Sequence, residues 1–229
     1  MDISPEIKGL LAFINQFKGE SVRAMYQRVG PMPHSKNCNA ILVRKIFSSY
    51  QGAASYRALY EANHLLVKTI QLNAAGYPKE SMSFPKFEYR DLVKEHWETS
   101  TLKQLFSRLF LLAVFQAKDS ENIFLGAFPW VMPEKDLNGE VKEVWTKTVG
   151  IIETGNIVIS NQQKLVLAFP KESETKVCHV RPHGKNSLDL SKLPSQETNT
   201  QYLGLPASSF WLNRQYVYDI VQKNQIFLR

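Results

Sequence analysis

The stretch HLLVKTIQL, residues 64–72, decides the fold class of this chain. It is rich in β-branched and aliphatic residues and is long enough to form a strand inside a sheet. Further strands are expected downstream, at residues 122–133, 156–160, 164–170 and 176–182. Residues 122–133 end in a turn bounded by proline. The stretch at 64–72 therefore predicts one strand of a mixed sheet.

Helical periodicity predicts helices before and after this strand. Ser4, followed by Pro5 and Glu6, is typical of a helix N-cap. Thr99 or Ser100 is expected to cap a strong helix with a wide apolar face over residues 102–113. The expected helices are residues 4–14, 22–29, about 40–50, a short helix before 64, 100–113, 140–152 and a last one capped by Asn213. The chain is thus expected to be a single α+β domain, residues 1–229, in which helices flank a mixed sheet.

Composition limits the function classes. There are 28 Lys and Arg against 21 Asp and Glu, a net charge of +7, which favours a partner with dense negative charge such as nucleic acid, although it also suits plain solubility. The longest apolar run, residues 109–115, is too short to span a bilayer, and the N-terminus lacks a signal-peptide core. We therefore expect a soluble cytoplasmic protein with no membrane partner. Cys38 and Cys178 predict neither a disulfide framework nor a zinc site.

One motif is typical of a magnesium-dependent nuclease. Asp136, Glu140 and Lys142 have the order of an acidic residue followed by E-x-K, in which carboxylates hold Mg²⁺ and the lysine polarises water or phosphate. The helical pattern of residues 139–152 places Glu140 in a first turn and directs Lys142 elsewhere. We expect a solvated helix start, and an active nuclease that uses these residues stays an alternative.

Other catalytic motifs give no support to an enzyme. In HVRPH, residues 179–183, Pro182 forbids the regular helix that would bring His179 and His183 together on a zinc ion. No phosphate-binding loop, nucleophile elbow or dinucleotide fingerprint occurs in the sequence.

From residue 40 onward, the order of motifs resembles the MutH-like restriction endonuclease family, which cuts DNA at GATC. The matching pieces are LLVKTIQL, GYPKES, HWETS, FLGAFPWVMPEKD, HVRPH and SSFWLNRQYV. The resemblance is strongest to the C-terminal, non-catalytic half of a staphylococcal GATC-cutting type II enzyme. It implies a restriction-endonuclease-like fold with two lobes around a DNA cleft. The N-terminal lobe, about 1–98, would hold a degenerate active site, and the C-terminal lobe, about 99–229, would hold the DNA-reading loops.

The resemblance also implies that the catalytic site has been lost. The family's E-L-K falls on Leu66, Val67 and Lys68, and its preceding aspartate falls on Leu59. The family's helix glutamate becomes Lys45, which is expected to repel a divalent cation, and its later lysine becomes Leu105. Mg²⁺ normally requires one or two protein carboxylates. No metal or other cofactor is expected on this chain, and Mg²⁺ is expected on the catalytic half of the parent enzyme.

The DNA-reading positions of the family are occupied by suitable side chains. Glu80 and Arg181 match an acidic residue and an arginine that reach base edges, as a carboxylate can with cytosine and an arginine with guanine. His183 replaces a lysine. Trp211 replaces a tyrosine that senses adenine methylation. The residues expected to contact phosphates are Lys36, Lys185 and Arg214.

The resemblance, with these residues, implies a GATC-binding effector domain of a type II site-specific deoxyribonuclease, without catalysis of its own. Its expected partners are double-stranded DNA that contains GATC, the N-terminal catalytic domain of the same polypeptide, and a second copy in a dimer on DNA. A structural or dimerisation module without specific DNA binding is the second alternative.

Overall fold

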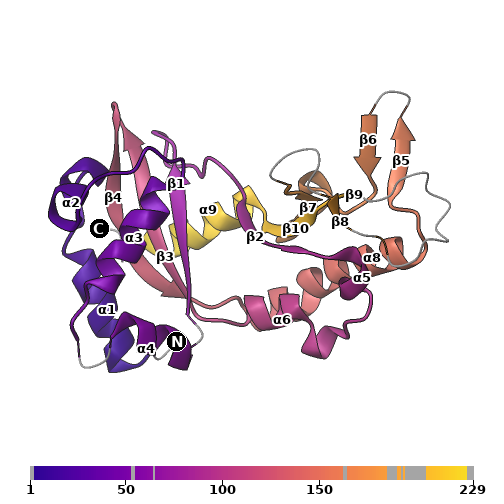
Figure 1. Ribbon diagram of the computed structural model, residues 1–229, viewed down its shortest axis with the longest axis horizontal. Helices are drawn as coiled ribbons and strands as arrows, with labels where there is room; N and C mark the ends of the chain where they lie inside the picture. The colour runs from indigo at the N-terminus through magenta and orange to yellow at the C-terminus, as the bar shows by residue number, and fades with distance from the viewer. Residues whose placement is uncertain are drawn as a thin grey trace. The chain divides into compact units, whose positions relative to one another are not determined.

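The structure is a computed structural model that describes residues 3–52, 55–63, 65–161, 164–184, 190–191, 193 and 205–225. Figure 1 shows the order of its elements. The α-helices are α1 (Pro5–Asn15), α2 (Val22–Val29), α3 (Cys38–Ser48), α4 (Tyr56–Asn63), α5 (Tyr89–Leu92), α6 (Thr101–Phe106), α7 (Glu134–Asp136), α8 (Lys142–Glu153) and α9 (Arg214–Lys223). The strands are β1 (Leu66–Leu72), β2 (Met82–Phe87), β3 (Phe110–Lys118), β4 (Glu121–Trp130), β5 (Val158–Asn161), β6 (Lys164–Leu167), β7 (Cys178–Pro182), β8 (Leu190–Ser191), β9 (Leu205–Pro206) and β10 (Ser208–Leu212). Single helical turns are η1 (Trp97–Thr99), η2 (Leu137–Val141) and η3 (Glu172–Glu174).

The chain forms two compact units that alternate along the sequence. The first comprises Met1–Glu80, Arg108–Val131 and Tyr218–Arg229, and the second comprises Ser81–Ser107 and Met132–Val217. The lobes expected from the sequence divide the chain once, near residue 98, whereas the chain passes between these units after residues 80, 107, 131 and 217. Local sequence patterns do not reveal such crossings. They indicate which face of a helix or strand is buried, but they do not indicate which sheet the element joins.

The first unit contains a mixed sheet in the order β1-β3-β4. Strand β1 is parallel to β3, and β3 is antiparallel to β4. One face of this sheet, with Leu111, Ala113 and Phe115 of β3, packs in a common core with apolar residues of α1, α2, α3 and α4. Ser4 caps α1, as predicted, because its Oγ accepts the backbone N–H of Ile7 at 3.4 Å. The α+β class, the mixed sheet and the flanking helices are confirmed, and they are compatible with a restriction-endonuclease-like fold.

The helix expected at residues 100–113 is wrong in its second half. Helix α6 begins after Ser100, whose Oγ accepts the N–H of Lys103, but it ends at Phe106, and the apolar run at 109–115 belongs to β3. Strand β3 lies between β1 and β4 and its residues from Phe110 to Phe115 are buried. A strand that is buried on both faces carries no polar alternation, so its sequence cannot be distinguished from that of a buried helix by period alone.

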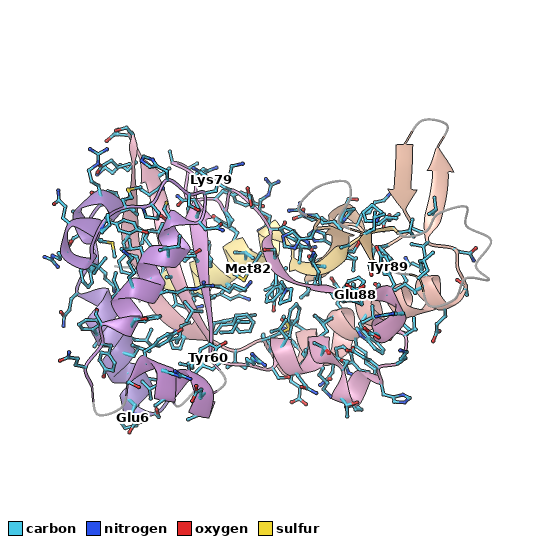
Figure 2. All side chains as sticks on the ribbon, in the orientation of Figure 1. Glu6, Tyr60, Lys79, Met82, Glu88 and Tyr89 are labelled. Atoms are coloured by element: carbon cyan, nitrogen blue, oxygen red, sulfur yellow. The ribbon has the colours of Figure 1, made fainter. Side chains whose placement is uncertain are left out.

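The second unit contains an antiparallel sheet in the order β2-β10-β7, with β10 in the centre. Beside it, Tyr89, labelled in Figure 2, is fully buried and donates its hydroxyl to the Pro206 carbonyl at 2.5 Å. Helix α8 confirms the amphipathic prediction, because its apolar positions, Val144, Trp145, Val149 and Ile152, are buried.

The start of helix α9 differs in detail from the predicted cap. Asn213 lies directly before the helix and its carbonyl accepts the N–H of Val217 at 2.9 Å. The Asn213 side chain, however, reaches back to β7 and to Thr175. The Glu172 carboxylate accepts the first backbone N–H of the helix, that of Arg214, at 2.8 Å. A carboxylate distant in sequence thus supplies the capping acceptor.

Candidate nucleic-acid interface

Strands β7 and β10 position most of the predicted DNA-reading side chains. Their register pairs Arg181 with Ser209 and His179 with Trp211. Because side chains alternate between the two faces of a sheet, His179, Arg181 and His183 project from the same face as Ser209 and Trp211. Alternation in two separate strands therefore brings an arginine, a tryptophan and two histidines together.

The guanidinium group of Arg181 lies over the ring of Trp211. The guanidinium carbon is 3.6 Å from the centre of the indole ring, which is a cation–π contact. The Arg181 side chain is exposed, whereas Trp211 is only 7% exposed. Among the residues that the structure describes, no carboxylate forms an ion pair with Arg181. Within these residues, the positive charge of Arg181 is therefore not neutralised by an acid.

The two histidines of HVRPH pack around the same tryptophan. The His183 ring meets the Trp211 ring edge-on at 4.7 Å between centroids, and His183 Nδ1 lies 2.9 Å from Ser209 Oγ. The His179 ring is nearly parallel to that of Trp211 at 6.5 Å, and its Nδ1 hydrogen-bonds Asn213 Oδ1 at 2.6 Å. Burial lowers the pKa of His179, so the ring is neutral near pH 7. These histidines therefore pack around Trp211 and support it.

The other predicted DNA contacts lie on separate surface segments. Glu80 is exposed in the turn that follows β1, beside Lys79, whose N–H donates to the Gln71 carbonyl at 2.8 Å. Lys36 is exposed in the loop before α3, and Arg214 is exposed at the first position of α9. Lys185 lies outside the described residues. The structure thus brings Arg181, His183 and Trp211 together, while Glu80 and Lys36 belong to the first unit.

The positions that match the family's catalytic site offer no carboxylate to a metal. Leu66 and Lys68 project from one face of β1. Leu59 is 4% exposed and belongs to the apolar core of the first unit. Among the described residues, no three His, Cys, Asp or Glu side chains are grouped as metal ligands. Two leucines and a lysine cannot supply the oxygen ligands of Mg²⁺, so these positions do not fit the ion.

Arg44 is a cation whose charge acts on Lys68. Burial, together with the positive charge of Arg44, lowers the pKa of Lys68 to about 8. Lys45 Nζ instead lies 5.8 Å from the centre of the Tyr26 ring. The repulsion expected between Lys45 and a divalent cation stays a prediction. Arg44 and Lys45 are adjacent on α3, and adjacent residues on a helix point about 100° apart, so the two side chains have different neighbours.

The three residues of the nuclease-like motif do not converge. Asp136 Oδ2 accepts the Tyr216 hydroxyl at 2.7 Å. Glu140 Oε1 accepts the backbone N–H groups of Lys176 and Val177. Lys142 Nζ lies 3.9 Å from Glu98 Oε1. Glu140 directly follows a kink at Gly139, where the backbone leaves the helical conformation. The expectation of a solvated carboxylate is wrong, because the carboxylate of Glu140 connects this turn to the approach to β7.

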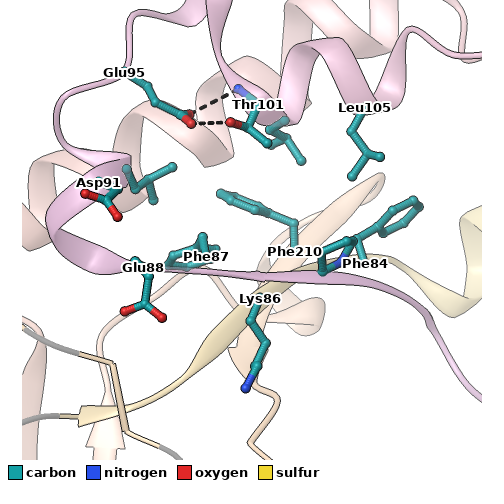
Figure 3. Close-up of a pocket in the computed structure, with 12 residues that line it drawn as sticks. Phe84, Lys86, Phe87, Glu88, Asp91, Glu95, Thr101, Leu105 and Phe210 are labelled. Carbon is teal, nitrogen blue, oxygen red and sulfur yellow. Dashed lines mark hydrogen bonds between the residues drawn. The ribbon is translucent and has the colours of Figure 1, made fainter. Parts of the chain in front are cut away.

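A cavity of about 260 Å³ opens in the second unit and was not predicted from the sequence. Figure 3 shows Phe84, Phe210 and Leu105 at its apolar wall, and the Glu95 carboxylate hydrogen-bonded to Thr101. Leu105, the position of the family's later lysine, is thus one of the apolar residues around a cavity. Residues from β2, α6 and β10 build this wall, so no single stretch of sequence carries its signal.

Comparison with known proteins gives one informative relationship. No family model matches the chain. The chain is 30% identical over 189 residues to the type II restriction enzyme Sau3AI of Staphylococcus aureus. The alignment includes 69% of this chain and 38% of the length of that enzyme. The similarity supports a relationship to the restriction endonucleases.

The described part of the chain contains no helix with the length and apolar character that crossing a membrane requires.

Proposed function

We propose that this chain binds double-stranded DNA at GATC and acts as a non-cutting effector domain of a type II restriction endonuclease. The relationship to a type II restriction enzyme supports a role in DNA binding, and the motif order of the MutH-like family supports GATC as the sequence. The catalytic step, with its Mg²⁺, would belong to another domain of the parent polypeptide. The net charge of +7 favours the polyanionic partner.

The observation that carries this proposal is the Arg181 side chain, which is exposed on the Trp211 ring and forms no ion pair with a carboxylate of the described residues. An arginine held flat can donate two parallel hydrogen bonds to O6 and N7 of guanine in the major groove. Each good contact of this kind is worth about 1–3 kcal/mol of discrimination against a wrong base. Glu80, which can accept from cytosine N4, is the proposed second reader. Lys36, Lys185 and Arg214 would contact phosphates and supply affinity without sequence information.

The absence of cutting follows from the residues at the former catalytic positions. Leu66 replaces a carboxylate, and Lys68 lies in the positive field of Arg44. Two cations and a leucine favour a phosphate but not a divalent metal ion. The chain would therefore hold DNA without hydrolysing it.

An effector role would explain why a domain binds GATC without cutting it. If GATC binding here changes the cleavage rate at a second GATC held by the catalytic domain, the two sites are coupled, with DNA looped between them. The proposed partners are thus the catalytic domain of the same polypeptide and a second copy in a dimer on DNA.

One experiment tests the proposal directly. The purified chain is titrated with a GATC duplex and a scrambled duplex at several salt concentrations, while plasmid cleavage with Mg²⁺ is assayed in parallel. We expect tighter binding to GATC at every salt concentration and no cleavage. Equal affinity for both duplexes would favour a structural module, and cleavage would favour an active nuclease.

A further inference from the structure

Trp211 contacts both the proposed reading residue and the core beneath it. It lies on β10, the central strand of its sheet, where it pairs with Ser83 on one side and His179 on the other. Its neighbours Phe210 and Leu212 are buried. A ring at such a position has little freedom to move, because strands on both sides fix its backbone.

The histidines restrict the tryptophan further. The His183 ring edge packs against the indole, and His183 is itself held 2.9 Å from Ser209 Oγ. His179, whose Nδ1 is held by Asn213, lies next to the indole on β7. Asn213 in turn donates to the Thr175 carbonyl at 2.8 Å. The indole is thus one surface of a hydrogen-bonded and packed cluster.

We infer that Trp211 is a positioning residue for Arg181: its ring holds the guanidinium plane in the orientation from which two donors reach one guanine edge. This inference rests on the proposed function. A solvent-exposed arginine samples many rotamers, and a two-pronged contact uses only a few of them. The contact of 3.6 Å between guanidinium and indole selects among these rotamers before DNA binds. Trp211 would therefore act through Arg181 and would set specificity without being a base-reading residue itself.

The test compares four forms of the full chain: wild type, Arg181→Ala, Trp211→Leu and Trp211→Phe. Leucine keeps an apolar side chain but removes the ring, and phenylalanine keeps an aromatic face. The measured quantity is the ratio of affinities for the GATC and scrambled duplexes at one salt concentration. We expect Trp211→Leu to lower this ratio about two- to fivefold, the change that corresponds to a cation–π contact of 0.5–1 kcal/mol. Trp211→Phe should retain most of the ratio.

The double variant separates positioning from a general structural role. In an Arg181→Ala background, Trp211→Leu should leave the ratio unchanged, since the residue through which Trp211 acts is absent. An equal loss in both backgrounds would overturn the inference. If Arg181→Ala itself leaves the ratio intact, the proposed function fails first, so the two failures are distinguishable.

A measurement on the wild-type chain covers the case in which Trp211→Leu does not fold. ¹⁵N relaxation of the Nε–Hε group reports how rigid an arginine side chain is. We expect Arg181 to be as rigid as a backbone amide, and Arg44, which is exposed on α3, to be flexible. Equal flexibility of the two groups would contradict a positioning role for Trp211.

Discussion

Glu140 Oε1 accepts the backbone N–H of Val177 at 2.5 Å, and thereby ties the turn before α8 to the start of β7. The same oxygen accepts the N–H of Lys176 at 2.6 Å. Glu140 therefore has a structural role, because it holds two segments together. The sequence around Glu140 does not reveal this role, since both donors lie more than 30 residues away.

Replacement of Glu140 tests this role. Glu140→Ala leaves two N–H groups without their acceptor, and hydrogen bonds to a charged group contribute about 1.5–3 kcal/mol. We expect the free energy of unfolding to fall by about that amount, measured by urea denaturation. Glu140→Gln should lose less, because its amide oxygen still accepts. Glu143→Ala, at an exposed position of α8, is the control and should be neutral. An unchanged stability of Glu140→Ala would contradict the structural role.

The proposed reading residue and the former catalytic lysine should behave differently on DNA. Arg181→Ala is expected to remove most of the preference for GATC, about 1–3 kcal/mol, because it deletes the donors to guanine. Lys68→Ala should weaken binding without changing the preference. Competition gel shifts with GATC and scrambled duplexes measure both effects. An equal loss of preference in the two variants would count against the role given to Arg181.

Phosphate contacts should be visible in the salt dependence of binding. Lys36→Ala is expected to weaken binding to both duplexes by the same factor, and to reduce the slope of log affinity against log salt by about 1. Lys94→Ala serves as a matched control, because Lys94 is already 3.3 Å from Asp91. A slope that is unchanged by Lys36→Ala would show that Lys36 does not contact phosphate.

The half-buried Lys68 should make stability depend on pH. Its folded pKa of about 8 lies below the ordinary 10.5, so the folded state binds fewer protons than the unfolded state between these values. Charged Lys68 therefore lowers stability below pH 8, and this penalty disappears as the pH rises from about 8 to 10.5. We expect Lys68→Met to raise the free energy of unfolding at pH 7 by about 1–3 kcal/mol, with a smaller gain at pH 9.5.

Urea denaturation of the wild type and of Lys68→Met at pH 7 and pH 9.5 checks this expectation. Lys103→Met is the control, which tests whether the replacement of any lysine gives the same result. Lys103 is held by Glu98, so its loss should not stabilise the protein. A gain for Lys68→Met that does not depend on pH would show that the desolvated charge is not its cause.

Much of the secondary structure could be predicted, because it follows from local periodicity. The strand at 64–72 and the helices with Ser4 and Trp145 are at the expected places. Most of the run at 109–115 was predicted as helix although it forms strand β3. Burial on both faces removes the alternation that identifies a strand. For the candidate site, the sequence predicted the individual residues but not their contacts. The contact between Arg181 and Trp211 is known only from the structure.

The sequence by itself determined which side chains are available: no carboxylate at positions 59 and 66, an arginine at 181 and an aromatic ring at 211. Only the tertiary structure decided which of them meet. Strand register placed Arg181 over Trp211, and the packing of α3 against β1 brought the charge of Arg44 near Lys68. The physical reason is that periodicity records how a single element faces its core, whereas the direction of a long cationic side chain depends on contacts contributed by elements remote in sequence.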